Sequence, residues 1–377
     1  MLMAKRGCQI HIRYMVLKGI ASYAKELKPA LSKRAFQPAR SRLWWMPVHL
    51  TVIAAVTTLA RSYLPAHWWL AFAVVPLIGF AFAGLTFLAH EALHGAVVRG
   101  KRLRYGVGFV GFLAFMVSPR LWIRWHNQEH HAHSQDPLTD PDAFPLLDRY
   151  QRSPQERWVI DYFSVGGKRL RGVITLLLGF TFHSLHMLLT ARRRGLLSAA
   201  EQRWAMFETL VGFAIWASVA VWVGPWTFVF VYVLPLMIAN SIVMAYILTN
   251  HSLSPLTRVN DPLVNSLSVT VPRFVDWLTM HFGFHVEHHI FPWMSTRHAK
   301  EVRALIQQRW PERYQSMPLH KALWALFKTA RVYKDETTLL DPQTGKQWPT
   351  LFPRHERHVN VLQPRPIRPF ESLPPAA

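Results

Sequence analysis

The chain has 377 residues, of which 51% are hydrophobic, and its 43 Lys and Arg against 21 Asp and Glu give a formal net charge of +22 at pH 7. The basic residues gather in the polar parts and leave long apolar runs untouched, which favours a membrane protein with basic aqueous faces and argues against a nucleic-acid partner. The single cysteine, Cys8, excludes an internal disulfide framework and indicates that the polar parts face a reducing compartment.

Residues 1–43 are rich in Lys and Arg and contain no signal-peptide pattern, so they predict a basic cytosolic segment at the membrane surface. The apolar stretches 44–64 and 68–89 follow, and each is long enough to cross a hydrocarbon core of about 30 Å. A short turn joins them into a hairpin. Two further apolar runs, 207–223 and 226–248, flank Gly224-Pro225 and predict a second hairpin.

Two other apolar stretches, 105–122 and 173–190, are ambiguous in the sequence. If the histidine clusters described below meet on one side of the bilayer, each of these stretches must dip in and return, or lie along the interface. We therefore expect four spans. The hairpin turns hold almost no Lys or Arg, whereas the N-terminal segment, the region 146–204 and the tail are rich in them, which predicts that all long polar segments and both termini are cytoplasmic.

The expected organisation is thus a basic segment at 1–43, a membrane domain at 44–334, and a Pro-rich, extended or poorly ordered tail at 335–377. Within the membrane domain, residues 292–334 predict a cytosolic helical cap. The predicted fold class is an all-α integral membrane protein whose four transmembrane helices form two hairpins beneath this cap. We expect it in a bacterial inner membrane with the active site on the cytoplasmic side.

Ten of the twenty histidines fall in three short windows, HEALH at 90–94, HNQEHHAH at 126–133 and HFGFHVEHH at 281–289. On a helix, histidines three or four residues apart share a face, as His285, His288 and His289 do. In the middle window His126 and His130 share a face, whereas His131 would lie about 100° around the helix. Imidazole is a ligand for iron, zinc, copper or nickel, so these windows predict a metal site.

HEALH by itself matches the H-E-x-x-H signature of zinc proteases. The windows and a further histidine after the fourth span supply nine candidate ligands: His90, His94, His126, His130, His131, His251, His285, His288 and His289. One four-coordinate zinc ion cannot use nine ligands, whereas two metals of higher coordination number can. The alternative interpretation of the three windows is a basic, pH-sensitive surface, but imidazoles packed together without a metal would repel one another on protonation. Glu91, Glu129 and Glu287 adjoin candidate ligands; they either orient the imidazole N–H groups or are solvated charges.

The three boxes HEALH, HNQEHH and HVEHH, in this order and with a membrane hairpin before the last, resemble those of the membrane fatty acid desaturase and hydroxylase superfamily. The flanking sequences HNQEHHAHSQDPLTDPDAFP and VEHHIFP strengthen the resemblance, which extends over residues 44–330. It implies a non-haem di-iron centre at the cytosolic face that is held by the eight box histidines, with His251 as a ninth ligand. His133 and His281 fall outside the core spacing, and the first box is short, with three residues between its histidines.

The resemblance implies an O2-dependent fatty acyl desaturase with two iron ions, acting on an acyl chain carried by a lipid, coenzyme A or a carrier protein. The sequence contains no flavin or dinucleotide fingerprint and no fused haem domain, so we expect electrons from a separate ferredoxin or cytochrome. The basic cytosolic face suits an acidic electron-transfer protein. Two alternatives stay open: a hydroxylase or ketolase on the same iron core, and an intramembrane zinc protease that uses HEALH alone.

Overall fold

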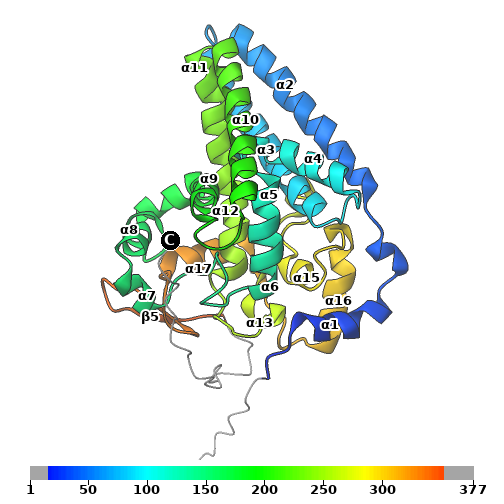
Figure 1. Cartoon of the computed structure of the whole chain (residues 1–377), viewed down its shortest axis with the longest axis vertical. Helices are drawn as coiled ribbons and strands as arrows, with labels where there is room; N and C mark the ends of the chain where they lie inside the picture. The colour runs from blue at the N-terminus through cyan, green and yellow to red at the C-terminus, as the bar shows by residue number, and fades with distance from the viewer. Residues whose placement is uncertain (1–15, 352–377) are drawn as a thin grey trace, which may run out of the picture.

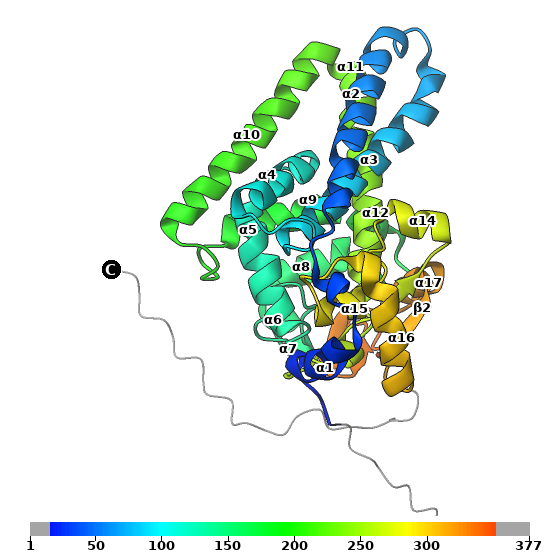
Figure 2. The same cartoon turned by 90° about the vertical axis from the view of Figure 1, so that its right-hand side faces the viewer.

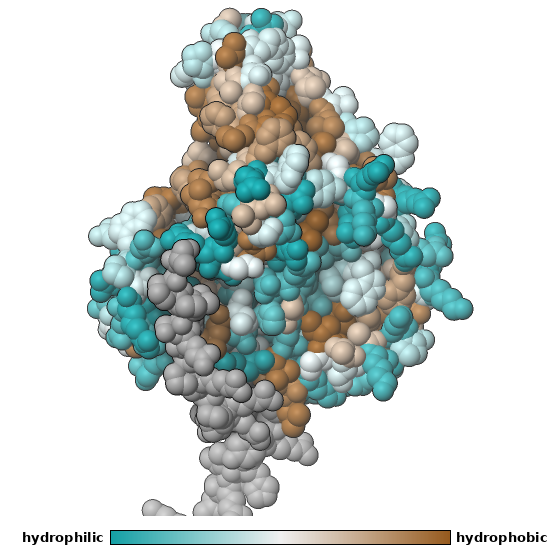
Figure 3. Space-filling view, in the orientation of Figure 1, coloured by the Kyte–Doolittle hydropathy of each residue, from teal (hydrophilic) through white to brown (hydrophobic). Residues whose placement is uncertain are grey.

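The computed structural model describes residues 16–351. Residues 1–15 of the basic N-terminal segment, among them Cys8, and residues 352–377 of the tail lie outside this described part. Five helical segments in it are long and apolar enough to cross a membrane, namely Arg40–Tyr63, Trp68–Leu93, Leu170–Thr190, Ala199–Val223 and Pro225–His251. Apolar surface dominates the upper part of the molecule in Figure 3, and polar surface dominates the lower part. This division fits an integral membrane protein.

The upper part is a bundle of long helices (Figures 1 and 2). Its members are η3 (Arg40–Trp44) with α2 (Trp45–Tyr63), η4 (Trp68–Leu70) with α3 (Ala71–Leu93), α10 (Ala199–Val223), and the run of α11 (Pro225–Phe228), the π-helix η8 (Val229–Val233) and α12 (Leu234–His251). Glycines in α3 allow close packing, since a Cβ at Gly79 would lie 2.7 Å from Ile238 and one at Gly84 would lie 2.3 Å from Nε2 of His49. The central helix α3 therefore packs directly against both α12 and α2.

The ambiguous stretch 105–122 dips alongside α3 and turns back. It forms α4 (Lys101–Gly111), η5 (Leu113–Phe115) and α5 (Pro119–Trp122), followed by the π-helix η6 (Ile123–His130) and α6 (His131–His133). A Cβ at Gly111 would lie 2.6 Å from the carbonyl oxygen of Leu85, so α4 lies tightly against α3. After the turn, the ring of Trp122 returns to within 4.8 Å of the ring of Phe112. This course brings the second histidine box back beside the end of α3.

The other ambiguous stretch forms α9 (Val173–Thr190), which lies against both α12 and α10. It follows α7 (Leu147–Arg152), α8 (Pro154–Phe163) and η7 (Leu170–Gly172). The backbone N–H of Thr181 donates to Oδ1 of Asn240 at 3.1 Å, and Gln202 donates to the carbonyl oxygen of Leu188 at 2.6 Å. Through Thr181 and Leu188, α9 thus contacts α12 and α10 in turn and joins these two helices.

Short elements form the cap below the bundle. They are α1 (Ile20–Leu27), η1 (Lys28–Ala30), η2 (Lys33–Phe36), α13 (Pro262–Asn265), β1 (Ser268–Thr270), α14 (Arg273–Leu278), α15 (His285–Ile290), η9 (Thr296–His298), α16 (Ala299–Arg309), β2 (Ser316–Pro318) and α17 (Leu319–Lys328). Strands β1 and β2 pair in parallel. Fully buried Asp261 accepts from Tyr23 at 3.0 Å and from Arg313 at 2.7 Å, which ties the N-terminal segment to the region after α16. The cap therefore includes residues of the N-terminal segment as well as those predicted at 292–334.

Residues 335–351 differ from the expectation of an extended or poorly ordered tail. Strands β3 (Val332–Asp335), β4 (Thr338–Leu340) and β5 (Gln347–Pro349) form an antiparallel sheet. Buried Tyr333 and Leu339 pack with Leu256, just beyond α12. A few apolar residues anchor this sheet within a segment whose composition is otherwise polar. The described part of the chain is therefore not all-α, as predicted, but mostly helical with two small sheets.

Candidate metal centre

Nine histidines from four separate parts of the chain meet where the bundle joins the cap. His90 and His94 lie at the end of α3, and His251 is the last residue of α12. The π-helix η6 and α6 provide the second box, and α15 provides the third. They form two clusters, one of five residues (His90, His94, His126, His131 and His288) and one of four (His130, His251, His285 and His289). All nine candidate ligands from the sequence are therefore together.

The ring nitrogens within each cluster point at one another. In the five-histidine cluster, Nε2 of His126 lies 3.0 Å from Nε2 of His90 and 3.2 Å from that of His131. In the four-histidine cluster, Nε2 of His285 lies 2.7 Å from Nε2 of His251 and 3.0 Å from that of His289. Donors bound at about 2.1 Å to the corners of an octahedron stand about 3.0 Å apart. The spacing therefore fits imidazoles arranged around a metal ion.

Burial strengthens this interpretation. Eight of the nine imidazoles are buried, and His94 is partly exposed. Nε2 of His94 has no hydrogen-bond partner in the described part of the chain. A buried polar atom without a partner is costly, and a metal ion would satisfy a converging lone pair such as that of His94. The donor set, made up of imidazoles alone, suits iron, zinc, copper or nickel.

The protonation states agree with metal binding. Burial and the neighbouring histidines hold the pKa of His126, His131 and His289 well below the usual value, and burial followed by the charge of His130 lowers the pKa of His288 to about 3. Neutral imidazole is the form that binds metals. His130 is the exception: burial alone would lower its pKa, but the carboxylates of Asp140 and Asp142 outweigh burial and raise the pKa to about 9.

A π-helix distributes the second box between the two clusters. In an α-helix His126 and His130 would share a face and His131 would lie to the side. The i→i+5 hydrogen bonding of η6 widens the turn, and His126 and His131, five residues apart, both enter the five-histidine cluster. His130 enters the other cluster. Sequence periodicity assumes 3.6 residues per turn and therefore misses this arrangement.

The three glutamates expected beside the ligands have other partners. Oε2 of Glu91 accepts from Arg42 at 2.6 Å, and Oε1 accepts from the backbone N–H of Thr296 at 2.9 Å. Glu287 accepts from Ser268, Arg303 and Tyr314. Glu129 lies 3.9 Å from His133, which belongs to neither cluster. Within residues 16–351 none of the three glutamates hydrogen bonds to a clustered imidazole, so in this structure they do not orient the ligands as expected. Glu91 and Glu287 instead tie the helices that carry the ligands to the rest of the cap.

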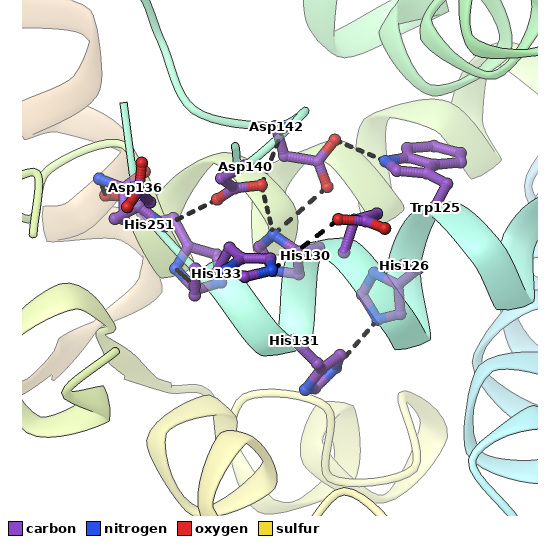
Figure 4. A network of polar contacts seen from close by, with 12 residues as sticks. Trp125, His126, His130, His131, His133, Asp136, Asp140, Asp142 and His251 are labelled. Atoms are coloured by element: carbon purple, nitrogen blue, oxygen red, sulfur yellow. Dashed lines mark hydrogen bonds and ion pairs between the residues drawn. The ribbon is translucent and has the colours of Figure 1, made fainter. Parts of the chain in front are cut away.

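Other groups orient the imidazoles. Nδ1 of His130 lies 3.1 Å from Oδ1 of Asp140 and 3.5 Å from Oδ2 of Asp142, and Nδ1 of His251 lies 3.0 Å from the carbonyl oxygen of Asn265. Figure 4 shows the two aspartates above His130. Sequence reasoning missed them. The acidic run at Asp136, Asp140 and Asp142, directly after the second box, was the available signal.

A membrane-helix bundle that ends in two clusters of converging imidazoles defines a membrane protein with a candidate site for two metal ions. The family model described as "Fatty acid desaturase" matches residues 66–320, and the chain belongs to this family. It is 33% identical to dihydrorhizobitoxine desaturase of Bradyrhizobium elkanii over 129 residues, which cover 33% of this chain and 35% of the relative. It is 21% identical to the chloroplastic omega-6 fatty acid desaturase of Spinacia oleracea over 315 residues, which cover 81% of this chain and 67% of that relative. The first match thus spans about a third of the relative's length.

Proposed function

We propose that the protein is a membrane-bound, O2-dependent fatty acyl desaturase that uses two non-haem iron ions. The observation that carries this proposal is the pair of imidazole clusters in a chain of the desaturase family. The reaction balances when an acyl –CH2–CH2– unit, O2, two electrons and two protons give –CH=CH– and two waters. Two bound irons would supply the activation of O2. The five-histidine cluster would hold one ion and the four-histidine cluster the other.

The residues around the clusters keep the site dry and rigid. The indole of Trp122 stacks on His126 with ring centroids 4.3 Å apart, and Phe282 packs against His90 at 5.0 Å. These rings cover part of the five-histidine cluster and would help to exclude water where C–H bonds are to be broken. The same packing restricts the orientation of the His126 and His90 imidazoles.

An apolar cavity supports an acyl substrate. It has a volume of about 70 Å³ and lies between α5, α9 and α10. Its lining includes Phe115, Met116, Leu121, Leu185 and Leu188. Leu121 lines this cavity, and its neighbour Trp122 stacks on His126, so a chain held here would lie one side chain away from a ligand of the five-histidine cluster. We infer that the cavity receives part of the acyl chain.

We infer further that four of the five apolar helical segments cross the membrane and that α9 does not. The third box contacts the ends of both helices: the ring of His288 lies 4.7 Å from that of His90 at the end of α3, and Nε2 of His285 lies 2.7 Å from that of His251 at the end of α12. The ends of α3 and α12 are therefore on the same side of the bilayer. A single crossing by α9 between them would put His251 on the opposite side. Basic residues also flank α9 at both ends: Lys168, Arg169 and Arg171 before it, and Arg192, Arg193 and Arg194 after it. The positive-inside rule then keeps both ends in the cytoplasm of a bacterial inner membrane.

Cysteine labelling tests this topology. In a chain in which Cys8 is replaced by Ala, single cysteines replace Ala66, in the turn after α2, and Arg193, after α9; both positions are exposed. A membrane-impermeant maleimide added to intact spheroplasts should label the first and not the second. Labelling of the cysteine at 193 from outside would refute the four-span arrangement.

Electrons would come from a separate ferredoxin or cytochrome with an acidic surface. His94 is the most exposed of the nine histidines, so a donor could come closest to the metal site there. Arg99, Lys101 and Arg102 are exposed nearby, at the start of α4, and none of them has a salt bridge within the described part of the chain. Unpaired positive charge attracts an acidic partner over about a Debye length. This surface therefore suits docking of the donor.

The test of the proposed function is gas chromatography with mass spectrometry of total fatty acids from a bacterial host that expresses the chain with an electron donor. The wild type is compared with His289→Ala, which removes one ligand of the four-histidine cluster. A new unsaturated acid present only with the wild type would support the proposal. A hydroxylated or oxo product would favour the hydroxylase or ketolase instead. No new product from an iron-loaded protein that the donor reduces would refute the proposal for ordinary acyl chains.

A further inference from the structure

One imidazole of the nine differs from the rest in its surroundings. Within residues 16–351, His130 is the only clustered histidine that contacts a carboxylate, with Asp140 at 3.1 Å and Asp142 at 3.5 Å from its Nδ1. The side chains of His130 and Asp140 are 4% and 1% exposed, so solvent screens this contact little. Within the described residues, the four-histidine cluster thus has a ligand in direct contact with carboxylates, and the five-histidine cluster has none, although Asp142 also lies within 4.8 Å of His126.

The loop after the second box is built to hold Asp140 in place. Oδ2 of Asp140 accepts from the backbone N–H of Gln135 at 2.7 Å, and Oδ1 accepts from that of Asp142 at 2.9 Å. Gln135 adopts the left-handed conformation with φ of 60°, and its buried amide donates to the carbonyl oxygens of His251 and Ser254. These hydrogen bonds therefore hold the loop over His130 and maintain the left-handed conformation of Gln135.

Asp142 is held by two donors of its own. Its Oδ1 accepts from Nε1 of Trp125 at 2.7 Å and lies 2.9 Å from Nε2 of His183, which leaves Oδ2 turned toward His130. Figure 4 shows Trp125 reaching Asp142 from the π-helix that also carries His130. Three elements thus converge on this carboxylate: η6, the loop after α6, and α9.

We propose that Asp140 and Asp142 are positioning residues for His130. They fix its Nδ1–H and direct its Nε2 into the four-histidine cluster, and their charge strengthens His130 as a donor to that cluster. Trp125 and His183 position Asp142 in turn. The proposal rests on the proposed metal-binding function of the two clusters. A carboxylate behind a ligating imidazole raises the basicity of that ligand, so the four-histidine cluster compensates for its missing fifth ligand.

Titration of the apo-protein with Co²⁺, followed by visible absorption, tests the proposal without relying on catalysis. Wild type should bind two equivalents. In Asp142→Asn and in Asp140→Asn/Asp142→Asn, one equivalent should bind about 10-fold to 100-fold more weakly, and the other should be unchanged. Trp125→Phe and His183→Gln should give smaller losses on the same equivalent. Thermal unfolding of each apo-variant verifies that it folds.

The matched control is Asp276→Asn. Asp276 forms the same kind of contact with a histidine outside the clusters, at 2.8 Å from Nδ1 of His281, and its loss should leave both equivalents unchanged. His251→Ala and His94→Ala give reference spectra for a chain that lacks one ligand of the four-histidine or the five-histidine cluster. The Asp142→Asn spectrum should resemble that of His251→Ala.

Three outcomes would overturn the proposal. Unchanged binding of both equivalents in the double variant would show that the aspartates do not support His130. Weakening of both equivalents, or of the one that His94→Ala affects, would show a general structural role. Binding of fewer than two equivalents by wild type would refute the proposed two-metal site itself and this proposal with it.

Discussion

Glu91, inside HEALH, offers a sharp test because two accounts give it opposite roles. As the base of a zinc protease it would be free to act on water. In this structure it is 5% exposed and paired with Arg42, itself 6% exposed, at 2.6 Å. Removing one partner of a buried ion pair costs about 3–5 kcal/mol. In Glu91→Ala the guanidinium keeps the carbonyl oxygen of Met280 and the hydroxyl of Thr296 as acceptors. We therefore expect the free energy of unfolding to fall by about 3 kcal/mol, at the lower end of this range.

The double variant Arg42→Met/Glu91→Leu leaves no unpaired buried charge. It still strands the backbone N–H of Thr296, which costs about 1–3 kcal/mol. Its stability should therefore lie between those of wild type and Glu91→Ala, and it should keep both metal equivalents. Thermal unfolding in detergent, followed by tryptophan fluorescence, ranks the stabilities of wild type and the variants. Glu129→Ala, at a half-buried glutamate of the second box, is the control and should unfold like wild type. A Glu91→Ala protein as stable as wild type, or a double variant less stable than Glu91→Ala, would refute the reasoning.

Three further predictions follow from the packing, the clusters and the basic surface. Gly84→Ala should lower the melting temperature, because its Cβ would lie 2.3 Å from Nε2 of His49, whereas Gly100→Ala, with nothing within 4 Å, should not; equal effects would contradict the close packing of α2 on α3. Metal analysis should find one equivalent lost or weakened in His251→Ala and both retained in His186→Ala, whose histidine is in neither cluster; two full equivalents in His251→Ala would contradict the ligand set. Lys101→Glu/Arg102→Glu should slow reduction by an acidic donor about tenfold at low salt, and Arg157→Glu, on α8, should not; an equal effect of both would place docking elsewhere.

The histidine pattern predicted the site because its logic is largely local. His285, His288 and His289 share a helical face through their spacing alone, and the four apolar runs predicted as spans all form long apolar helices. The meeting of the three boxes and His251 was the premise from which four spans were predicted, and the structure brings these nine histidines together. Features that depend on residue spacing and apolar length within one segment could therefore be predicted from the sequence.

The features that the sequence did not predict depend on tertiary structure or unusual geometry. The π-helix that assigns His126 and His130 to different clusters changes the residue period itself. The pairing of Glu91 with Arg42 joins residues 49 positions apart, so proximity in sequence to a ligand gave the wrong partner. Asp142 reaches His130 only because the loop after α6 folds back over the helix. The sheet at 332–349 depends on a few apolar residues that meet Leu256 across the fold.

The central claim is that two hydrogens leave neighbouring carbons of an acyl chain while oxygen ends in water. Host cells that express the chain and a donor are fed fully deuterated acyl chains under ¹⁸O2, and the new product is analysed by mass spectrometry. The account requires a product that has lost two deuterium atoms from adjacent carbons and gained no ¹⁸O. A product that has lost one deuterium and gained one ¹⁸O would contradict desaturation and identify a hydroxylase.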